Sequence, residues 1–264
     1  MDIASIVGLI GGIVVMLFTI LLSGDIMGYI HVPSITCTFG GTIAMTVMGY
    51  PMNKTIEGLK ALKYVFLYTE TKPEDVIKSI IDLANVARKE GLLALEEAAQ
   101  QIKDEFLQKG IMLIVDGTDP ELVRNILDTE LSFIEDRHKG NQGLYDYMAA
   151  MGPAFGMLGT LIGLINMLAH LSDVATLGPN MAVAIVTTFY GSIIANVFCM
   201  PVSNKLKIRS AEEILMKEVM LEGMLSIQAG ENPRIIEEKL KAFLAPKLRS
   251  NTKKGSNESI EGEE

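Results

Sequence analysis

The sequence predicts an all-α integral membrane protein with four transmembrane helices. It also predicts a helical cytoplasmic domain, built from the loop between the second and third spans and from the C-terminal tail. Hydrophobic residues make up 49% of the 264 positions although the net charge is -9, so polar and apolar residues are segregated along the chain. No Asp, Glu, Lys or Arg occurs in residues 3–24, 26–53, 147–172 or 174–204. Each run exceeds the ~20 residues that cross a bilayer core of ~30 Å.

The basic residues predict the orientation of these spans. Twelve of the 23 Lys and Arg residues lie within positions 54–139, and the other 11 lie within positions 205–254. The short connections around Asp25 and Asp173 contain none. Because cytoplasmic segments are rich in Lys and Arg, both termini and the large middle loop are expected in the cytoplasm, which makes a multi-pass protein with four spans.

The first region, residues 1–52, holds the first two spans. Residues 3–22 form the first span, and no basic segment of the signal-peptide type precedes it, so this span is expected to stay in the mature protein. Pro33 opens the second span, and Pro51 ends it. The second span carries Thr36, Thr38, Thr42 and Thr46, whose hydroxyls are expected to bond to their own backbone or to a neighbouring helix.

The second region, residues 53–146, has the composition of a water-soluble helical domain. A first helix is expected from Pro73 to Gly91, because proline is favoured in a first helical turn and glycine stops a helix. A second helix is expected over residues 92–109, ending at Gly110, and a third over residues 120–139.

The third region, residues 147–202, holds the third and fourth spans. Small residues recur in both at steps of four, three and four, which places them on one helix face and lets helices approach closely in lipid. They are Gly152, Gly156, Gly159 and Gly163 in the third span, and Ala184, Thr188, Gly191 and Ala195 in the fourth. Pro153 is expected to kink or hinge the third span, while Pro179 opens and Pro201 closes the fourth.

The rest of the chain is predicted to be a cytoplasmic tail. Residues 203–249 are expected to be helical to about Gln228 and again, after a turn, over residues 234–244. Residues 250–264 are polar and have no apolar stripe, so they are predicted to be disordered.

The residue patterns of catalysis and metal binding are missing from the sequence. It contains no phosphate-binding loop, no Cys or His set at metal spacing and no Gly-x-Ser-x-Gly elbow. Cys37 and Cys199 fall inside predicted spans, where a thiol behaves as a small hydrophobe. No basic patch with interleaved aromatic residues indicates nucleic acid. Neither enzymatic activity nor a metal, a cofactor or a nucleic-acid partner is expected.

The spans also lack an ionisable group at membrane depth. Ion pathways normally use an intramembrane carboxylate, because it binds the ion and releases it again. If this protein works with an ion gradient, the titrating group must therefore come from a second protein. The hydroxyls of this chain would then only line the surroundings of that group.

Four stretches resemble the MotA/PomA family of flagellar motor stator subunits, and the resemblance covers essentially residues 1–248. The stretches are Ala87-Arg88-Lys89-Glu90-Gly91-Leu92-Leu93-Ala94-Leu95-Glu96, Gly152-Pro153-Ala154-Phe155-Gly156-Met157-Leu158-Gly159-Thr160-Leu161-Ile162-Gly163-Leu164, Gly178-Pro179-Asn180-Met181-Ala182-Val183-Ala184 and Ser226-Ile227-Gln228-Ala229-Gly230-Glu231-Asn232-Pro233-Arg234. They occur in the order and on the topology of that family.

The resemblance implies a bacterial inner-membrane protein that couples cation flow to rotation and to torque on the flagellar rotor. It implies a ring of five copies around MotB/PomB-type partners, each with one membrane helix, an ion-binding aspartate and a peptidoglycan-binding domain. The transported ion is H⁺ or Na⁺, and no cofactor is implied. By motif match, Arg88, Lys89 and Glu96 would contact the rotor switch protein FliG, Pro153 and Pro201 would be pore-helix hinges, and Thr160, Thr187 and Thr188 would line the ion route.

Several alternatives remain open at this point. A threonine at position 160 resembles the sodium-driven branch of the family, which would favour Na⁺ as the transported ion. Proton-driven members are common, so H⁺ is placed first and Na⁺ second. A proton-motive-force energiser of the ExbB or TolQ type shares the two pore helices, although those proteins resemble three-span chains. A small-solute transporter that works alone would carry its own midplane site, and neither an inverted repeat nor a buried charge is visible in the sequence.

Overall fold

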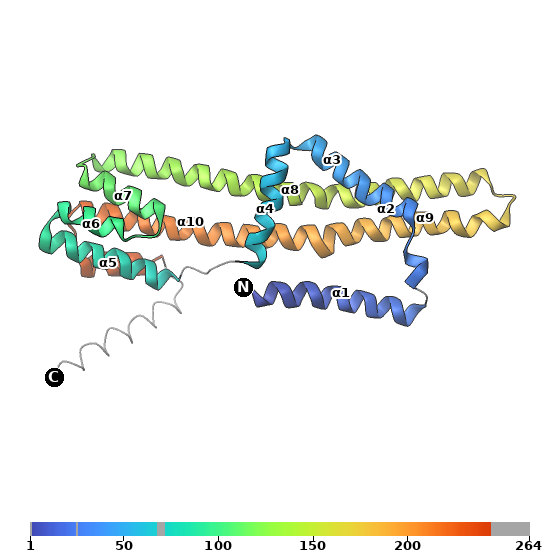
Figure 1. Ribbon diagram of the computed structural model, residues 1–264, viewed down its shortest axis with the longest axis horizontal. Coiled ribbons are helices and arrows are strands. Elements are labelled where there is room, and N and C mark those ends of the chain that lie inside the picture. Colours follow the sequence, from blue (N-terminus) through green and yellow to red (C-terminus); the bar gives the residue numbers. More distant parts are fainter. Residues whose placement is uncertain (1, 25, 68–71, 244–264) are drawn as a thin grey trace. The chain divides into compact units, whose positions relative to one another are not determined.

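The computed structural model describes residues 2–24, 26–67 and 72–243, and every regular element in these residues is helical (Figure 1). Four of the described helices are long and apolar enough to cross a membrane, which confirms the predicted fold class. The predicted disordered tail, residues 250–264, lies outside the described residues.

The chain divides into two compact units. The first comprises Met1–Thr69 and Arg137–Arg209, and the second comprises Glu70–Asp136 and Ser210–Glu264. The domain boundaries predicted at residues 53, 147 and 203 follow the distribution of charge along the sequence, whereas these two units follow packing. The predicted boundaries therefore stay a prediction.

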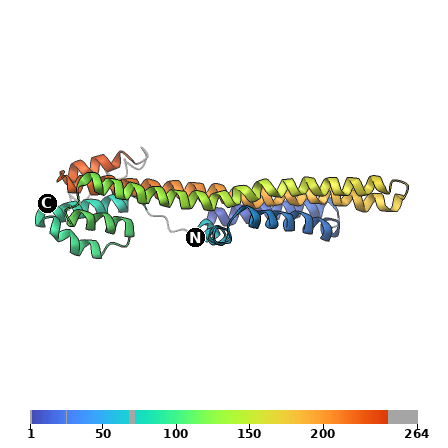
Figure 2. The same cartoon turned by 90° about the horizontal axis from the view of Figure 1, so that it is seen from above.

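The first unit contains the predicted spans. Its elements are α1 (Ile3–Ser23), η1 (Ile26–Tyr29), α2 (Val32–Ile35), the π-helix η2 (Thr36–Gly40), α3 (Gly41–Gly49), α4 (Met52–Phe66), α9 (Val174–Ser192) and the π-helix η4 (Ile193–Cys199). Two long helices, α8 (Pro120–Ala169) and α10 (Met200–Gln228), contribute to both units. The chain reverses between α8 and α9, so the third and fourth spans run antiparallel and side by side in Figures 1 and 2.

Three sequence-based helix boundaries in this unit were wrong. Helix α8 is continuous through residues 139–147, where a break was expected before the third span. Pro179 lies inside α9 rather than at its start, because Asp173 caps the helix by accepting a hydrogen bond from the Ala175 amide at 3.1 Å. Pro201 does not end the fourth span, since η4 leads directly into α10.

The second unit is a helical bundle. Helices α5 (Pro73–Glu90), η3 (Leu92–Ala94), α6 (Leu95–Gln100), α7 (Glu105–Val115) and α11 (Pro233–Lys241) surround the start of α8 and the end of α10 (Figure 2). Its core includes the fully buried side chains of Ile80, Leu95, Ile111, Met224 and Leu240. The predicted helical end at Gln228 is confirmed, and α11 ends three residues earlier than the last residue predicted for it.

The helix predicted over residues 92–109 is interrupted, because Asp104 starts a new helix there. The Asp104 carboxylate accepts a hydrogen bond from the Leu107 amide at 3.0 Å and so caps α7. Gly110 was expected to stop a helix but lies inside α7. A Cβ at position 110 would lie 2.2 Å from Sδ of Met224, so this glycine permits a close helix approach.

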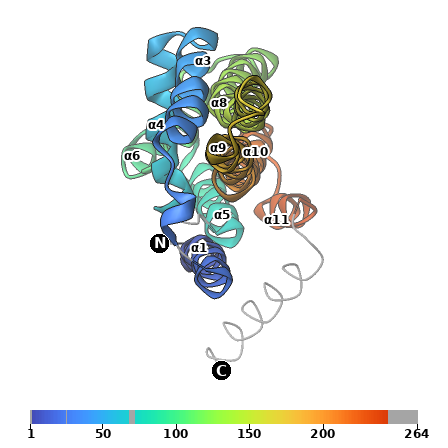
Figure 3. The same cartoon turned by 90° about the vertical axis from the view of Figure 1, so that its right-hand side faces the viewer.

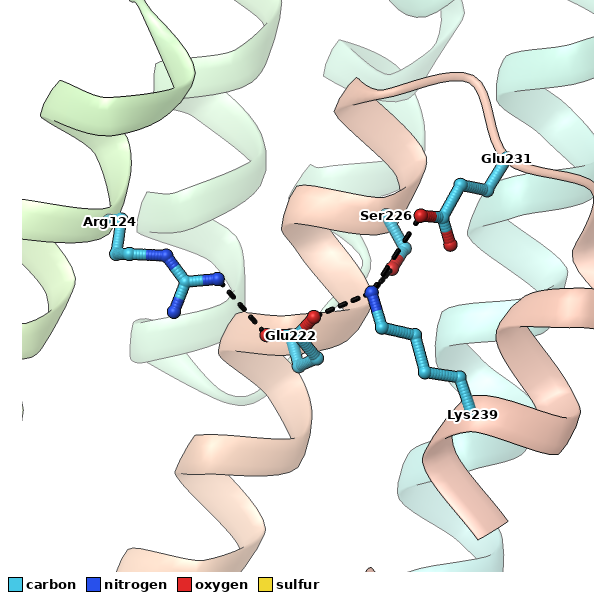
Figure 4. A network of polar contacts seen from close by, with 5 residues as sticks. All are labelled: Arg124, Glu222, Ser226, Glu231 and Lys239. Carbon is cyan, nitrogen blue, oxygen red and sulfur yellow. Dashed lines mark hydrogen bonds and ion pairs between the residues drawn. The ribbon is translucent and has the colours of Figure 1, made fainter. Parts of the chain in front are cut away.

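A polar network joins three helices of this unit (Figure 4). Glu222 of α10 accepts a hydrogen bond from Lys239 of α11 at 2.6 Å and pairs with Arg124 of α8 at 3.1 Å. The hydrogen bond from Lys239, and then that from Arg124, lower the pKa of Glu222 despite its partial burial. The same bond to Glu222 raises the pKa of Lys239, which also donates to the Ser226 hydroxyl at 3.1 Å.

Candidate functional site

The third and fourth spans pack against each other through their small residues. All four glycines of the third span are buried, as are Ala184, Gly191 and Ala195 of the fourth. A Cβ at position 163 would lie 2.7 Å from the Asn180 carbonyl oxygen, and one at position 156 would lie 3.1 Å from the Thr187 carbonyl oxygen. Because these neighbours are backbone atoms, the two helices approach as closely as glycine allows.

The contact is closest where Gly191 meets the third span. A Cβ at position 191 would lie 2.6 Å from the carbonyl oxygen of Gly152 and 3.1 Å from Cα of Pro153. A Cβ at position 152 would in turn lie 3.0 Å from the Gly191 carbonyl oxygen. The backbone at Gly152 thus leaves no room for a side chain at position 191, and the backbone at Gly191 leaves none at position 152.

Two of the three predicted ion-route hydroxyls lie together. The hydroxyl oxygens of Thr160 and Thr188 are 2.6 Å apart, and either can be the donor. Thr160 also lies within hydrogen-bond distance of the carbonyl oxygens of Gly156, at 3.1 Å, and Ala184, at 3.0 Å. Four uncharged oxygens are thus gathered at one point between α8 and α9, where they could face an ion but could not titrate.

Thr187 shares an acceptor with this pair, because its hydroxyl lies 3.1 Å from the same Ala184 carbonyl oxygen. Its side chain is fully buried, its hydroxyl donates within its own helix, and a Cβ at Gly159 would lie 2.4 Å from its Cγ2. Thr38 of the second span donates to the Thr187 carbonyl oxygen at 3.4 Å. Adjacent residues point about 100° apart around an α-helix, so Thr187 and Thr188 face different surroundings. In this structure Thr187 therefore serves contact between the spans.

The hydroxyls of the second span make the bonds that were expected of them. Thr36, Thr42 and Thr46 donate to the carbonyl oxygen four residues earlier, at 3.0, 2.7 and 2.7 Å. Thr38, Thr42 and Thr46 are buried, which confirms that these residues belong to helix packing.

The two predicted hinge prolines lie within continuous helical structure. Pro153 lies inside α8, where a proline cannot donate to the carbonyl oxygen of Ala149. Pro201 lies in the first turn of α10, directly after the π-helix η4. A π-helical turn has a hydrogen-bond pattern that differs from that of an α-helix, and such turns often occur at functional sites. The sequence did not predict either π-helix.

The three predicted rotor-contact residues lie around one tight turn. Arg88 and Lys89 end α5, Gly91 follows with a φ of +87°, and Glu96 lies in the first turn of α6. All three charged side chains are exposed, and within the described part of the chain none of them forms an ion pair. Leu95, fully buried, anchors the segment in the core of the second unit. The turn therefore exposes side chains of both signs of charge.

Sequence analysis missed two charge clusters at the ends of the spans. The Asp146 carboxylate accepts hydrogen bonds from the Ser203 hydroxyl at 2.6 Å and from Lys207 at 2.8 Å, which ties α8 to α10. Partial burial alone would raise the pKa of Asp146, but the bonds from Lys207 and Ser203 outweigh this effect and lower it. The one signal in the sequence was that the aspartate of each cluster directly borders a charge-free run.

The second cluster joins the start of α1 to α10. Asp2 accepts hydrogen bonds from the Ser5 amide at 3.2 Å, and it pairs with Lys205 and Arg209 at 2.5 Å each. The hydrogen bond from Lys205 is the largest influence, and the pKa of Asp2 is held well below its usual range. Helix α1 also contacts α4 and η4 of the first unit, and Figure 3 shows α1 nearly end-on.

Among the described residues, the arrangement offers packing faces, hydroxyls and exposed charges. Within the described residues, no group of three or more His, Cys, Asp or Glu side chains could hold a metal ion. The geometry is that of a closely packed helix pair with threonine hydroxyls at the contact.

Comparison with known proteins gives consistent matches. The profile of the MotA/TolQ/ExbB proton channel family matches residues 98–219. Motility protein A of Treponema pallidum is 41% identical over 249 residues, covering 94% of this chain and 96% of the relative. Chemotaxis protein PomA of Vibrio alginolyticus is 39% identical over 244 residues, covering 92% and 96%.

A solved structure matches over a similar share of the chain. The flagellar MotAB stator complex from Bacillus subtilis contains a chain that aligns with a TM-score of 0.86 at 32% identity, covering 94% of this chain and 98% of that one. The relatives are named as motility and chemotaxis proteins, and the family is named as a channel family. These names confirm the prediction that the chain is not an enzyme. By identity, coverage and fold, the chain belongs to the motility protein A group of the MotA/TolQ/ExbB proton channel family.

Proposed function

We propose that this chain is a stator subunit of a bacterial flagellar motor. In a complex with a MotB-type partner it couples cation flow to torque on the rotor. The observation that carries the proposal is a pair of antiparallel spans, packed on glycine, whose polar groups at the contact are threonine hydroxyls. The likeness to a MotAB stator chain over 94% of the sequence supports it. The energiser alternative is less favoured, because the full-length relatives described above are motility and chemotaxis proteins.

The partner supplies the ion-binding carboxylate, and five copies of this chain surround it. No Asp or Glu lies within the four charge-free runs, so the titrating group belongs to the partner's membrane helix. The protein resides in the bacterial inner membrane with both termini in the cytoplasm. This orientation is supported by the ion pairs of Asp2 with Lys205 and Arg209, because they hold the starts of α1 and α10 at the same face as the basic loops.

The mechanism follows from the cost of a buried charge. Binding of a cation neutralises the partner's aspartate, which removes the desolvation cost of moving it along an apolar surface. The partner helix then passes from one subunit to the next. Release of the cation restores the charge and stops the motion. Thr160 and Thr188 offer hydroxyls to the ion on this route without holding it as a charged group would.

The rotor contact is made by Arg88, Lys89 and Glu96 with FliG. Exposed ion pairs are individually weak, so this contact can form and break as the ring turns. In the test, Arg88→Glu should cut motor torque in a tethered-cell assay while ion conduction by the complex stays intact. The matched control is Lys78→Glu, an exposed lysine of the same helix α5, which should leave torque unchanged. Normal torque in the Arg88→Glu cells would argue against the contact.

The proton is the proposed ion, with sodium second. The clustered oxygens around Thr160 are compatible with either, because hydroxyl and carbonyl oxygens also coordinate Na⁺. Swimming speed measured at fixed pH after sodium is replaced by potassium separates the two. A proton-driven motor keeps its speed, and a sodium-driven one stops.

A further inference from the structure

Helix α4 carries an apolar face that nothing in its own unit covers. Met52, Ile56 and Leu59 follow each other at helical spacing and are 58%, 44% and 54% exposed, and Tyr64 is 59% exposed. The opposite face is buried: a Cβ at Gly58 would lie 2.3 Å from Leu144, and the fully buried Tyr145 hydroxyl donates to the Gly58 carbonyl oxygen at 3.0 Å. The helix is therefore fixed in orientation, with one large apolar stripe turned outward.

The position of α4 places this stripe at the membrane boundary. The helix starts two residues after Tyr50, which caps the C-terminus of the second span. Its inner face packs on Tyr145 and on Val202 and Leu206, which lie within three residues of the ends of the third and fourth charge-free runs. The inner face of α4 thus rests on the points where other spans leave the bilayer, and α4 runs across the long helices in Figure 1, so it stays near that depth.

Two lysines lie within the apolar stripe. Lys63 is four residues from Leu59, and Lys60 is four residues from both Ile56 and Tyr64, so these side chains share one face. Neither lysine forms an ion pair among the residues that the structure describes, whereas Lys54 of the same helix lies 3.6 Å from Glu57. A surface cavity of about 560 Å³ lies here, lined by Leu59, Lys60, Leu62, Lys63, Tyr64 and Phe66.

We propose that this face of α4 binds anionic phospholipid headgroups, with Lys60 and Lys63 on the phosphate and the apolar side chains among the first acyl carbons. A helix with lysines beside an apolar stripe is built for the interface of a negatively charged membrane. A second copy of the chain fits less well, because the centres of protein interfaces are depleted of lysine. The inference does not depend on motor function.

The experiment measures lipid bound to the detergent-purified, delipidated complex of the full chain with its partner, by native mass spectrometry. Phosphatidylglycerol should bind the wild type more tightly than phosphatidylcholine. The Lys60→Gln/Lys63→Gln variant should bind phosphatidylglycerol about thirtyfold more weakly, as expected for two lysines at an anionic surface, with phosphatidylcholine binding unchanged. The matched control is Lys54→Gln, because Lys54 of the wild type already pairs with Glu57. This variant should bind both lipids as the wild type does.

Three outcomes would overturn the inference. One is equal phosphatidylglycerol binding by the double variant and the wild type. Another is full competition by inorganic phosphate, which would make a free anion the ligand rather than a lipid. The third is a smaller complex mass on light scattering for the Ile56→Ser/Leu59→Ser variant, which would mean that a neighbouring subunit covers the stripe. An unchanged mass with weaker binding of both lipids supports the lipid as occupant.

Discussion

Replacing Gly191 by alanine tests whether the close approach of the third and fourth spans holds this unit together. The added Cβ would lie 2.6 Å from the Gly152 carbonyl oxygen, whereas ordinary contact begins near 3.4 Å. The spans would therefore have to separate locally by about 0.8 Å, the difference between these distances, because both neighbours at this point are backbone atoms. Overpacking of this kind costs about 1–3 kcal/mol, or roughly 2–10 °C in Tm for a chain of this size.

The assay is a thermal melt of the detergent-purified complex followed by far-UV circular dichroism, combined with swarm diameter in soft agar. Gly140→Ala is the matched control, because Gly140 lies on the same helix as Gly152 and a Cβ there would meet nothing within 4 Å. Alanine at that exposed helix position should keep or slightly raise the Tm. If Gly191→Ala melts as high as Gly140→Ala, the spans have slack at this point and the packing argument fails.

Two further predictions concern hydroxyls and charge. Thr160→Val keeps the side-chain shape but removes the hydroxyl shared with Thr188, so we expect a loss of about 0.5–1.5 kcal/mol in stability and slower swimming with normal assembly; normal swimming speed would remove Thr160 from the ion route. Because the folded-state pKa of Glu222 is below its usual value of 4.5, its stabilisation is complete above that pH and is lost as the pH falls through the folded pKa. Glu222→Gln should make the Tm of the second unit depend less on pH below the usual value of 4.5, and an unchanged acid slope would contradict the role of the network.

The four spans could be predicted from the sequence because a bilayer tolerates few charges, so a long charge-free run nearly always indicates a membrane span. The ends of the helices were harder to predict than the spans. Gly110 looked like a stop signal, but its role is to admit Met224, a residue more than a hundred positions away. Local patterns do not contain such contacts. For the same reason the break expected after Lys139 is bridged, since the buried Leu144 and Tyr145 keep α8 helical there.

The sequence predicted which residue types form the candidate site, but it did not predict which way their side chains face. The four-three-four spacing correctly placed Gly152 and Gly191 on facing sides of two helices, since that spacing follows from helix geometry alone. The burial of Thr187 beside the exposed Thr188 depends on the rotation of α9 about its axis, which the contact with the second span helps to set. The clusters around Asp2 and Asp146 needed knowledge of which helix ends meet, and a sequence without helix pairings does not contain it.

The bond between Asp2 and Arg209 has a consequence for how the protein is made. The two partners are 207 positions apart in the chain. At a synthesis rate of ~5–20 residues per second, roughly 10–40 s pass between the emergence of the first and that of the second from the ribosome. During that interval the carboxylate at the start of α1 must be hydrated or held by other groups. The contact of α1 with α4 can form early, but the ionic anchor at the start of α1 waits until the whole membrane portion of the nascent chain has been made.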